Sequence, residues 1–245
     1  MLHIFVTHSD LVGKLDLEGH FTYGSSPLNS DLLSELSKNR GFKLAALNIT
    51  SIPGHIEELR IYMNSKCIDI LAVNETRLDD TISSGEVAVP GYALERNDRN
   101  RDGGGVALYI RNTINYERLF DLECESLEWI GIKVIKPKAK SFIVSTWYRP
   151  PRSNVDAMKD FERLVQRIES LGLEVNILGV LNCNVAACSL ESHTKNLLEI
   201  CNLYQYHQLI NEHTRITEKP ATTIDLFLTN LTRKFLRILG SVTSE

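Results

Sequence analysis

Four polar residues stand at the ends of apolar segments of this chain, in the positions where sheet proteins commonly carry their chemistry. They are Asn48, Glu75, Tyr148 and Asn182. A carboxylate can bind a cation or accept a proton, while amide and phenol groups can hydrogen-bond an anionic oxygen. Taken singly these residues are not specific, because a lone Glu at a strand end is usually a solvated charge and a lone Asn usually shapes a turn. Their sequence contexts, taken together, are more informative.

Six short segments match, in order and spacing, the motifs of one protein family. They are Leu47-Asn48-Ile49, Val73-Asn74-Glu75-Thr76-Arg77-Leu78, Gly103-Gly104-Gly105-Val106-Ala107-Leu108-Tyr109-Ile110, Trp147-Tyr148-Arg149-Pro150-Pro151, Ile177-Leu178-Gly179-Val180-Leu181-Asn182 and Thr223-Ile224-Asp225-Leu226-Phe227. Over about residues 43–242 the chain resembles the endonuclease domain of non-LTR (LINE-type) retrotransposon reverse transcriptase proteins, a branch of the endonuclease/exonuclease/phosphatase family. The resemblance implies an α+β fold, a four-layer αββα sandwich of the DNase I-like type, at residues 43–245 and without its last strand.

The resemblance also implies roles for individual residues. Glu75 would be the main ligand of Mg²⁺ or Mn²⁺, with Asn48 beside it, because a divalent cation offsets the charge of a phosphodiester during cleavage. Tyr148 would hydrogen-bond the scissile phosphate, and Asn182 would position the attacking water or a phosphate oxygen. Asp225 matches an acid that orients a catalytic His. The expected substrate is DNA, contacted by the basic residues Arg96, Arg99, Arg101 and Arg149.

Two departures from the family pattern bear on catalysis. The family motif Gly-Asp-Phe-Asn reads Gly179-Val180-Leu181-Asn182 here, so Val180 stands where an Asp is expected. A Ser-Asp-His motif is expected near the C-terminus, yet no His follows His213. A valine can neither accept a proton nor bind a metal ion, and a general acid or base typically contributes about 10²–10⁴-fold. The sequence therefore predicts a degenerate, C-terminally truncated site with weak or absent activity and weakened metal binding.

Three alternatives stay open beside an impaired endonuclease. The chain could be a non-catalytic module that still binds DNA through its arginines, or a decayed retroelement copy without a selected function. It could also belong to a phosphatase-type branch of the same family, whose members act on inositol phosphates, sphingomyelin or mRNA tails. The Trp147–Pro151 and Gly103–Gly105 segments are more similar to the retroelement type.

Apolar periodicity predicts the elements that must position these residues. A strand–helix–strand start followed by closely spaced strands favours antiparallel sheet over continued βα alternation. Ser51 is expected to cap the first helix through its side chain. Residues 1–42 show little periodicity and are treated as a leader of uncertain order. Strands are expected at 43–49, 69–73, 92–95, 106–110, 127–134, 142–148, 175–181, 224–229 and 235–239, and helices at about 52–63, 156–171 and 197–204.

Composition limits the class of protein. The 245 residues are 43% hydrophobic, which is ordinary for one large globular domain. The net charge of −4 excludes a chain that binds nucleic acid through its overall charge, so local basic groups would have to attract DNA. No apolar run approaches the ~18 residues of a membrane span, and the N-terminus lacks a basic signal-peptide region. We therefore expect an intracellular protein, in the nucleus or the cytoplasm, without a membrane partner.

The cysteines argue against a disulfide framework. The five cysteines are dispersed and form no C-x-x-C pair, so neither internal disulfides nor a disulfide-linked partner is expected. Zinc ligation by Cys183, Cys188 and His193 is a weak alternative, because structural zinc sites usually combine two close pairs of ligands. Reduced, partly buried thiols are the favoured interpretation.

Overall fold

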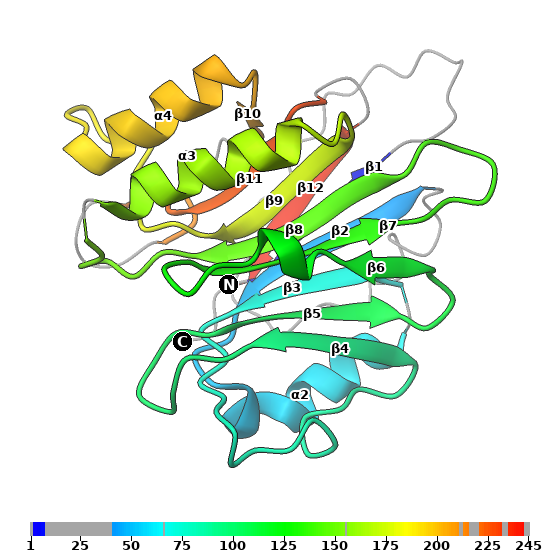
Figure 1. Cartoon of the computed structure of the whole chain (residues 1–245). Coiled ribbons are helices and arrows are strands. Elements are labelled where there is room, and N and C mark those ends of the chain that lie inside the picture. The colour runs from blue at the N-terminus through cyan, green and yellow to red at the C-terminus, as the bar shows by residue number, and fades with distance from the viewer. Residues whose placement is uncertain are drawn as a thin grey trace.

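Two six-stranded mixed sheets form the centre of the molecule (Figure 1). The computed structural model describes residues 2–7, 41–65, 67–154, 156–210, 213–215, 221–231 and 235–242, the first and last of these as backbone only. The first sheet has the order β12-β1-β2-β3-β5-β4, and the second has the order β10-β11-β9-β8-β7-β6. The first comprises β1 (Leu2–Thr7), β2 (Phe42–Asn48), β3 (Ile70–Asn74), β4 (Tyr92–Asn97), β5 (Val106–Arg111) and β12 (Phe235–Val242). The second comprises β6 (Tyr116–Arg118), β7 (Glu128–Val134), β8 (Phe142–Tyr148), β9 (Glu174–Val180), β10 (His207–Gln208) and β11 (Asp225–Thr229).

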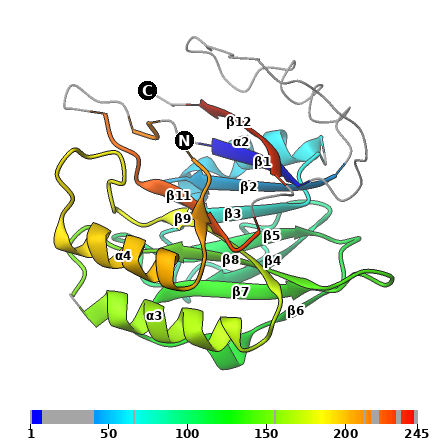
Figure 2. The same cartoon turned by 90° about the horizontal axis from the view of Figure 1, so that it is seen from above.

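Helices cover the outer face of each sheet, so the molecule has four layers (Figures 1 and 2). Helix α2 (Ile52–Asn64) packs on the first sheet, while α3 (Asp156–Glu169) and α4 (Ser192–Leu203) pack on the second. A short 3-10 turn, η1 (Phe120–Leu122), precedes β7. The two parallel pairs, β2 with β3 and β8 with β9, are each joined through a helix, and the other neighbouring strands run antiparallel. This is the predicted αββα sandwich.

The central strands are apolar on both faces because each sheet is buried between two layers. Along β3, Ile70 and Ala72 face the second sheet, whereas Leu71 and Val73 face α2. The inter-sheet core also contains Leu178 and other side chains of β2, β5, β7, β8 and β11. A near-continuous apolar run in the sequence is therefore the signature of these strands.

Most of the predicted elements are confirmed within one to three residues. Helix α4 begins at Ser192 rather than Leu197, because its first turn is polar and carries no apolar repeat. The sequence analysis missed β6 and β10, which have three and two residues. Within the predicted leader, residues 2–7 form β1, which pairs with both β2 and β12; residues 8–40 lie outside the described residues. The domain boundary at residue 42 stays a prediction.

The expected side-chain cap of α2 is wrong. Ser51 occupies the N-cap position, but its side chain makes no capping hydrogen bond and its φ is 147°. The N–H of Ile52 instead donates to the carbonyl of Thr76 at 2.9 Å. The loop that follows β3 therefore satisfies the first N–H of the helix and ties α2 to β3.

Candidate active site at the ends of β2, β3, β8 and β9

Two of the predicted residues form a direct contact at the ends of the parallel strands β2 and β3. The side-chain Nδ2 of Asn48 donates to Oε1 of Glu75 at 2.9 Å. Because β2 and β3 are in register from Leu44 opposite Ile70 to Asn48 opposite Asn74, both side chains lie at the same edge of the first sheet. The structure thus brings the expected metal ligand and its neighbouring amide together.

The backbone around Glu75 is held in an unusual conformation. Glu75 has a φ of 56°, in the left-handed region that non-glycine residues rarely adopt. The next two N–H groups, of Thr76 and Arg77, donate to the carbonyls of Gly105 and Gly104 at 3.2 and 3.0 Å. The glycine segment before β5 therefore fixes the loop that carries the Glu75 carboxylate.

Tyr148 ends β8 on the opposing sheet and lies beside Glu75. The pKa of the Tyr148 phenol is raised to about 12, mainly by burial and in addition by the nearby negative charge of Glu75. The phenol therefore stays protonated at neutral pH and can donate a hydrogen bond to an anionic oxygen. This is the chemistry that the predicted phosphate contact requires.

Asn182 follows β9 in a left-handed conformation, with a φ of 49°. Its Nδ2 donates to the carbonyl of Arg149 at 2.8 Å. Arg149 is 4% exposed, and its Nη1 donates to the carbonyl of Leu181 at 3.3 Å. This geometry favours a structural role for Arg149, which holds the Asn182 loop in place, rather than the substrate contact that the sequence predicted for Arg149.

Val180 is buried between the two sheets. Its side chain is 3% exposed within the inter-sheet core, and its N–H donates to Oδ1 of Asn74 at 3.1 Å. Nδ2 of Asn74 donates in turn to Oγ1 of Thr146 at 3.0 Å, so this one amide links β3 to both β8 and β9. Asp225 is directly opposite Val180 in the β9–β11 pairing and is 9% exposed. The site thus has an apolar side chain where the family pattern has an acid.

Glu128 is a neighbour of the site that the sequence analysis missed. It is the first residue of β7 and lies opposite Tyr148 in the β7–β8 pairing. Oε1 accepts from Nη1 of Arg99 at 2.7 Å, and Oε2 accepts from the N–H of Gly105 at 2.6 Å. Burial raises the pKa of the Glu128 carboxyl, and the negative charge of Glu75 adds to that shift. Three acids within six residues precede Trp129 in the sequence, and nothing in that spacing indicates which one faces the site.

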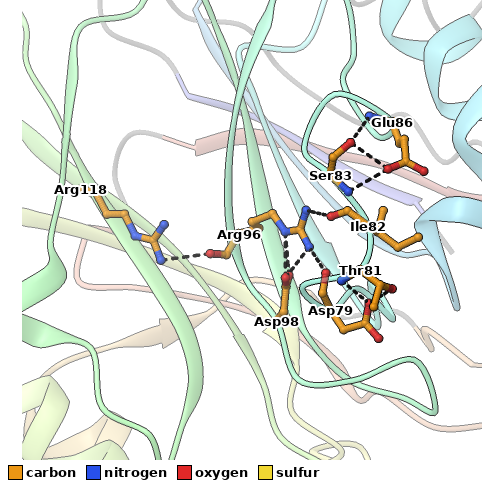
Figure 3. A network of polar contacts seen from close by, with 8 residues as sticks. All are labelled: Asp79, Thr81, Ile82, Ser83, Glu86, Arg96, Asp98 and Arg118. Atoms are coloured by element: carbon orange, nitrogen blue, oxygen red, sulfur yellow. Dashed lines mark hydrogen bonds and ion pairs between the residues drawn. The ribbon is translucent and has the colours of Figure 1, made fainter.

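The four predicted substrate-binding arginines lie in different environments. Arg96 donates through Nε, Nη1 and Nη2 to Asp98 and to the carbonyls of Ile82 and Asp79 (Figure 3). These bonds fasten the 79–86 loop to β4 and favour a structural role for Arg96. Arg99 and Arg101 are both exposed, and Arg99, at 36%, is paired with Glu128.

An open cavity of about 540 Å³ adjoins Arg99, Glu128 and Tyr148 and extends to the first turns of α3, including Asp156 and Asp160. Carboxylates outnumber arginines among its lining residues. A phosphate would therefore be attracted to the part nearest Arg99 and repelled elsewhere.

The donor atoms around Glu75 fit a hydrated cation. Mg²⁺ prefers oxygen ligands and keeps several waters, so the Glu75 carboxylate, held by Nδ2 of Asn48, is a ligand of the suitable type. Among the described residues, no three His, Cys, Asp or Glu side chains are grouped as a tight metal site would need. This finding also gives no support to a zinc site at Cys183, Cys188 and His193. None of the five cysteines, all of which lie in the described part of the chain, forms a disulfide bond.

Comparison with known proteins places the fold. No protein-family model and no curated protein sequence matches the chain. Among solved structures, the endonuclease domain of TRAS1, a telomere-specific non-LTR retrotransposon, aligns with a TM-score of 0.61 and 10% identity over 76% of this chain and 83% of its own. The Xenopus laevis APE2 catalytic domain aligns with a TM-score of 0.55 and 16% identity over 76% of this chain and 82% of its own. A mannosyl-6-phosphatase of Bacteroides thetaiotaomicron gives a TM-score of 0.50 and 13% identity, covering 76% and 84%.

The chain therefore has the DNase I-like fold of the endonuclease/exonuclease/phosphatase proteins. Of these three structures, the retrotransposon endonuclease domain has the highest TM-score, and it represents the branch that the sequence motifs resemble. Within the described residues, no helix is long and apolar enough to cross a membrane.

Proposed function

We propose that this chain is a retroelement-type endonuclease/exonuclease/phosphatase domain, related to Mg²⁺-dependent hydrolases that nick DNA, and that its catalysis is impaired. The observation that carries the proposal is the Asn48–Glu75 contact beside Tyr148, whose pKa is raised, together with Val180 buried between the sheets where the family pattern has an acid. Asn48, Glu75 and Tyr148 suit the binding of a cation and a phosphodiester. Val180 replaces the acid that would act on the attacking water.

The residues present divide the work as follows. Glu75, with Asn48 orienting its carboxylate, would hold Mg²⁺ or Mn²⁺, which supplies charge stabilisation at the phosphate when it is bound. The Tyr148 phenol donates to a phosphate oxygen. Asn182 positions water or a phosphate oxygen, and the buried Val180 leaves that water without a proton acceptor. Substrate would therefore be bound and oriented, but turnover would be very slow.

A plasmid-nicking assay with Mg²⁺ tests this proposal. We expect purified wild-type protein to nick supercoiled DNA no faster than Glu75→Ala, which removes the cation ligand. Robust nicking by the wild-type chain that Glu75→Ala abolishes would refute the impaired site. Repeating the assay with Mn²⁺ covers the second cofactor.

A repaired chain tests the assignment of Val180. Val180→Asp combined with an added C-terminal Ser-Asp-His segment should restore measurable nicking. Val180→Asn with the same segment should not, because Asn has nearly the shape of Asp but lacks the carboxylate that accepts a proton. If the Asp variant folds and stays as inert as the Asn variant, the assignment of position 180 is wrong.

A non-catalytic DNA-binding remnant is the second candidate, and the availability of Arg99 favours it. DNA binding that weakens with salt and occurs without cleavage is expected for it, because phosphate contacts release counterions. Salt-independent binding would contradict it.

A further inference from the structure

Arg99 is anchored on three sides at the mouth of the candidate site. Its Nε donates to the carbonyl of Gly103 at 2.8 Å, and its Nη1 donates to Oε1 of Glu128 at 2.7 Å. Its Cζ lies 5.9 Å from the centre of the Tyr148 ring. These two hydrogen bonds use two of the five N–H groups of a guanidinium, and the side chain is 36% exposed. Arg99 therefore keeps donors for a ligand while its orientation is fixed.

Glu128 is itself locked in place. Both of its carboxylate oxygens accept hydrogen bonds, one from Arg99 and one from the N–H of Gly105, and its side chain is 18% exposed. A Cβ at Gly104 would lie 2.4 Å from both Cζ of Arg99 and Oε2 of Glu128. The pair thus depends on the absence of a side chain at position 104.

Contrast with the neighbouring arginines singles out Arg99. Arg96 uses most of its donors within the protein and is 14% exposed, and Arg149 is almost fully buried. Arg101 is exposed, and no anchoring hydrogen bond of its side chain is found among the described residues. Only Arg99, of these four, is both anchored and accessible, which is the combination that binds a phosphate with little loss of side-chain entropy.

We propose that Glu128 is a positioning residue that holds the Arg99 guanidinium ready to contact a phosphate of the nucleic-acid backbone beside Tyr148. This inference rests on the proposed function and adds to it the residue that prepares the phosphate contact. Guanidinium groups suit this task because their planar donors match phosphate oxygens. Glu128 lowers the net positive charge of the site, so it does not help to attract a phosphate. Its contribution is to fix the orientation of the Arg99 guanidinium.

That opposition between charge and geometry gives a clear test. If net charge alone governed binding, Glu128→Gln would remove a negative charge and strengthen the binding of DNA. If Glu128 positions Arg99, the same substitution weakens binding, because Gln offers one acceptor oxygen to the two donors of Arg99 and Gly105. The sign of the change therefore separates the two explanations.

The experiment measures binding of a fluorescein-labelled DNA duplex by fluorescence anisotropy across a salt series in Mg²⁺ buffer. We expect Arg99→Ala to weaken binding about tenfold and to reduce the salt slope by about one, as the loss of one phosphate contact predicts. Glu128→Gln should weaken binding several-fold in the wild-type background. In the Arg99→Ala background it should no longer weaken binding, because no guanidinium remains to be positioned.

Arg163→Ala is the matched control, since Arg163 is also paired with an acid, Asp160, at 2.8 Å, and lies on α3. It should leave affinity within about twofold, as expected for a solvated surface charge. Equal losses in Arg163→Ala and Arg99→Ala, or stronger binding by Glu128→Gln, would overturn the positioning role. If wild-type protein shows no salt-dependent binding, the proposed function itself fails.

Near-UV circular dichroism checks that each variant keeps its tertiary packing. Should Glu128→Gln lose the native spectrum, Glu128→Asp replaces it, since Asp keeps the charge but withdraws the carboxylate by one methylene. The same weakening is expected for Glu128→Asp, and unchanged affinity in a folded Asp variant would also overturn the inference.

Discussion

Gly104 sets how closely the charged residues of the site can approach one another. Its φ of +69° and its buried position leave no room for a side chain between Arg99 and Glu128. Glycine adopts this conformation without the steric penalty that other residues pay. A single backbone position thus governs both the Arg99–Glu128 pair and, through its carbonyl, the Glu75 loop.

Gly104→Ala should destabilise the protein by about 2 kcal/mol or more, because it combines a positive φ with a steric overlap. Urea unfolding followed by circular dichroism measures the loss. Gly85→Ala is the control, since a Cβ at Gly85 would meet only Oγ of Ser83, at 3.8 Å; a change within about 0.5 kcal/mol is expected there. Equal effects at both glycines would show that the space around Gly104 is not restrictive.

At this scale, the sequence identifies residue types but not their partners. The motif context was sufficient to predict that Asn48 and Glu75 share a site, because both end neighbouring strands. It could not separate Arg96 from Arg99, since their environments depend on how the 79–86 loop and β7 pack against β4. Glu128 was missed for the same reason.

At the scale of elements, apolar patterning predicts the strands and polar details decide where they end. β3 and β8 are buried along their whole length, so their apolar runs were clear in the sequence. Segments such as β10 are too short to show a period, and its two residues are placed by pairing with β11. The link from Asn74 to Thr146 and Val180 was also invisible, because it joins residues 72 and 106 positions apart.

Two thiols are buried, that of Cys183 in the loop after β9 and that of Cys201 on α4, and they should be far less reactive than the exposed thiols. Burial raises the pKa of Cys183 to about 11 and that of Cys201 to about 12. At pH 8 their thiolate fractions are about 10⁻³ or lower, and the thiolate is the reactive form. A chromogenic aromatic disulfide should label the exposed Cys124 and Cys188 quickly, and Cys183 and Cys201 only after unfolding.

The same shifts predict how stability depends on alkaline pH. The folded-state pKa values exceed the ~8.5 of an unfolded thiol, so the folded protein binds protons that the unfolded chain releases. The contribution of these thiols to stability is therefore fully present below about pH 8.5 and falls as the pH rises towards their folded-state pKa values.

Rapid labelling of all five thiols in folded protein at pH 8 would contradict the burial of Cys183 and Cys201.

At the scale of the whole molecule, an apolar layer and several hydrogen bonds join the two sheets. The inter-sheet core takes side chains from β2, β3 and β5 on one side and from β7, β8, β9 and β11 on the other. Asn74 adds hydrogen bonds across the same interface. Because the candidate site is assembled from both sheets, its geometry depends on their folding as one unit.

Leu59→Ala tests this coupling across all four layers. Leu59 is 2% exposed between α2 and the first sheet, whereas the two tryptophans, Trp129 and Trp147, lie in the second sheet, and Trp147 stacks on Phe161 of α3. The substitution should cost about 2–5 kcal/mol and shift the urea midpoints of tryptophan fluorescence and far-UV circular dichroism equally. Ile61→Ala, on the same helix at 72% exposure, should change stability by no more than about 0.5 kcal/mol. An unshifted fluorescence midpoint in Leu59→Ala would show that the sheets unfold separately, and the candidate site would then be lost before the second sheet unfolds.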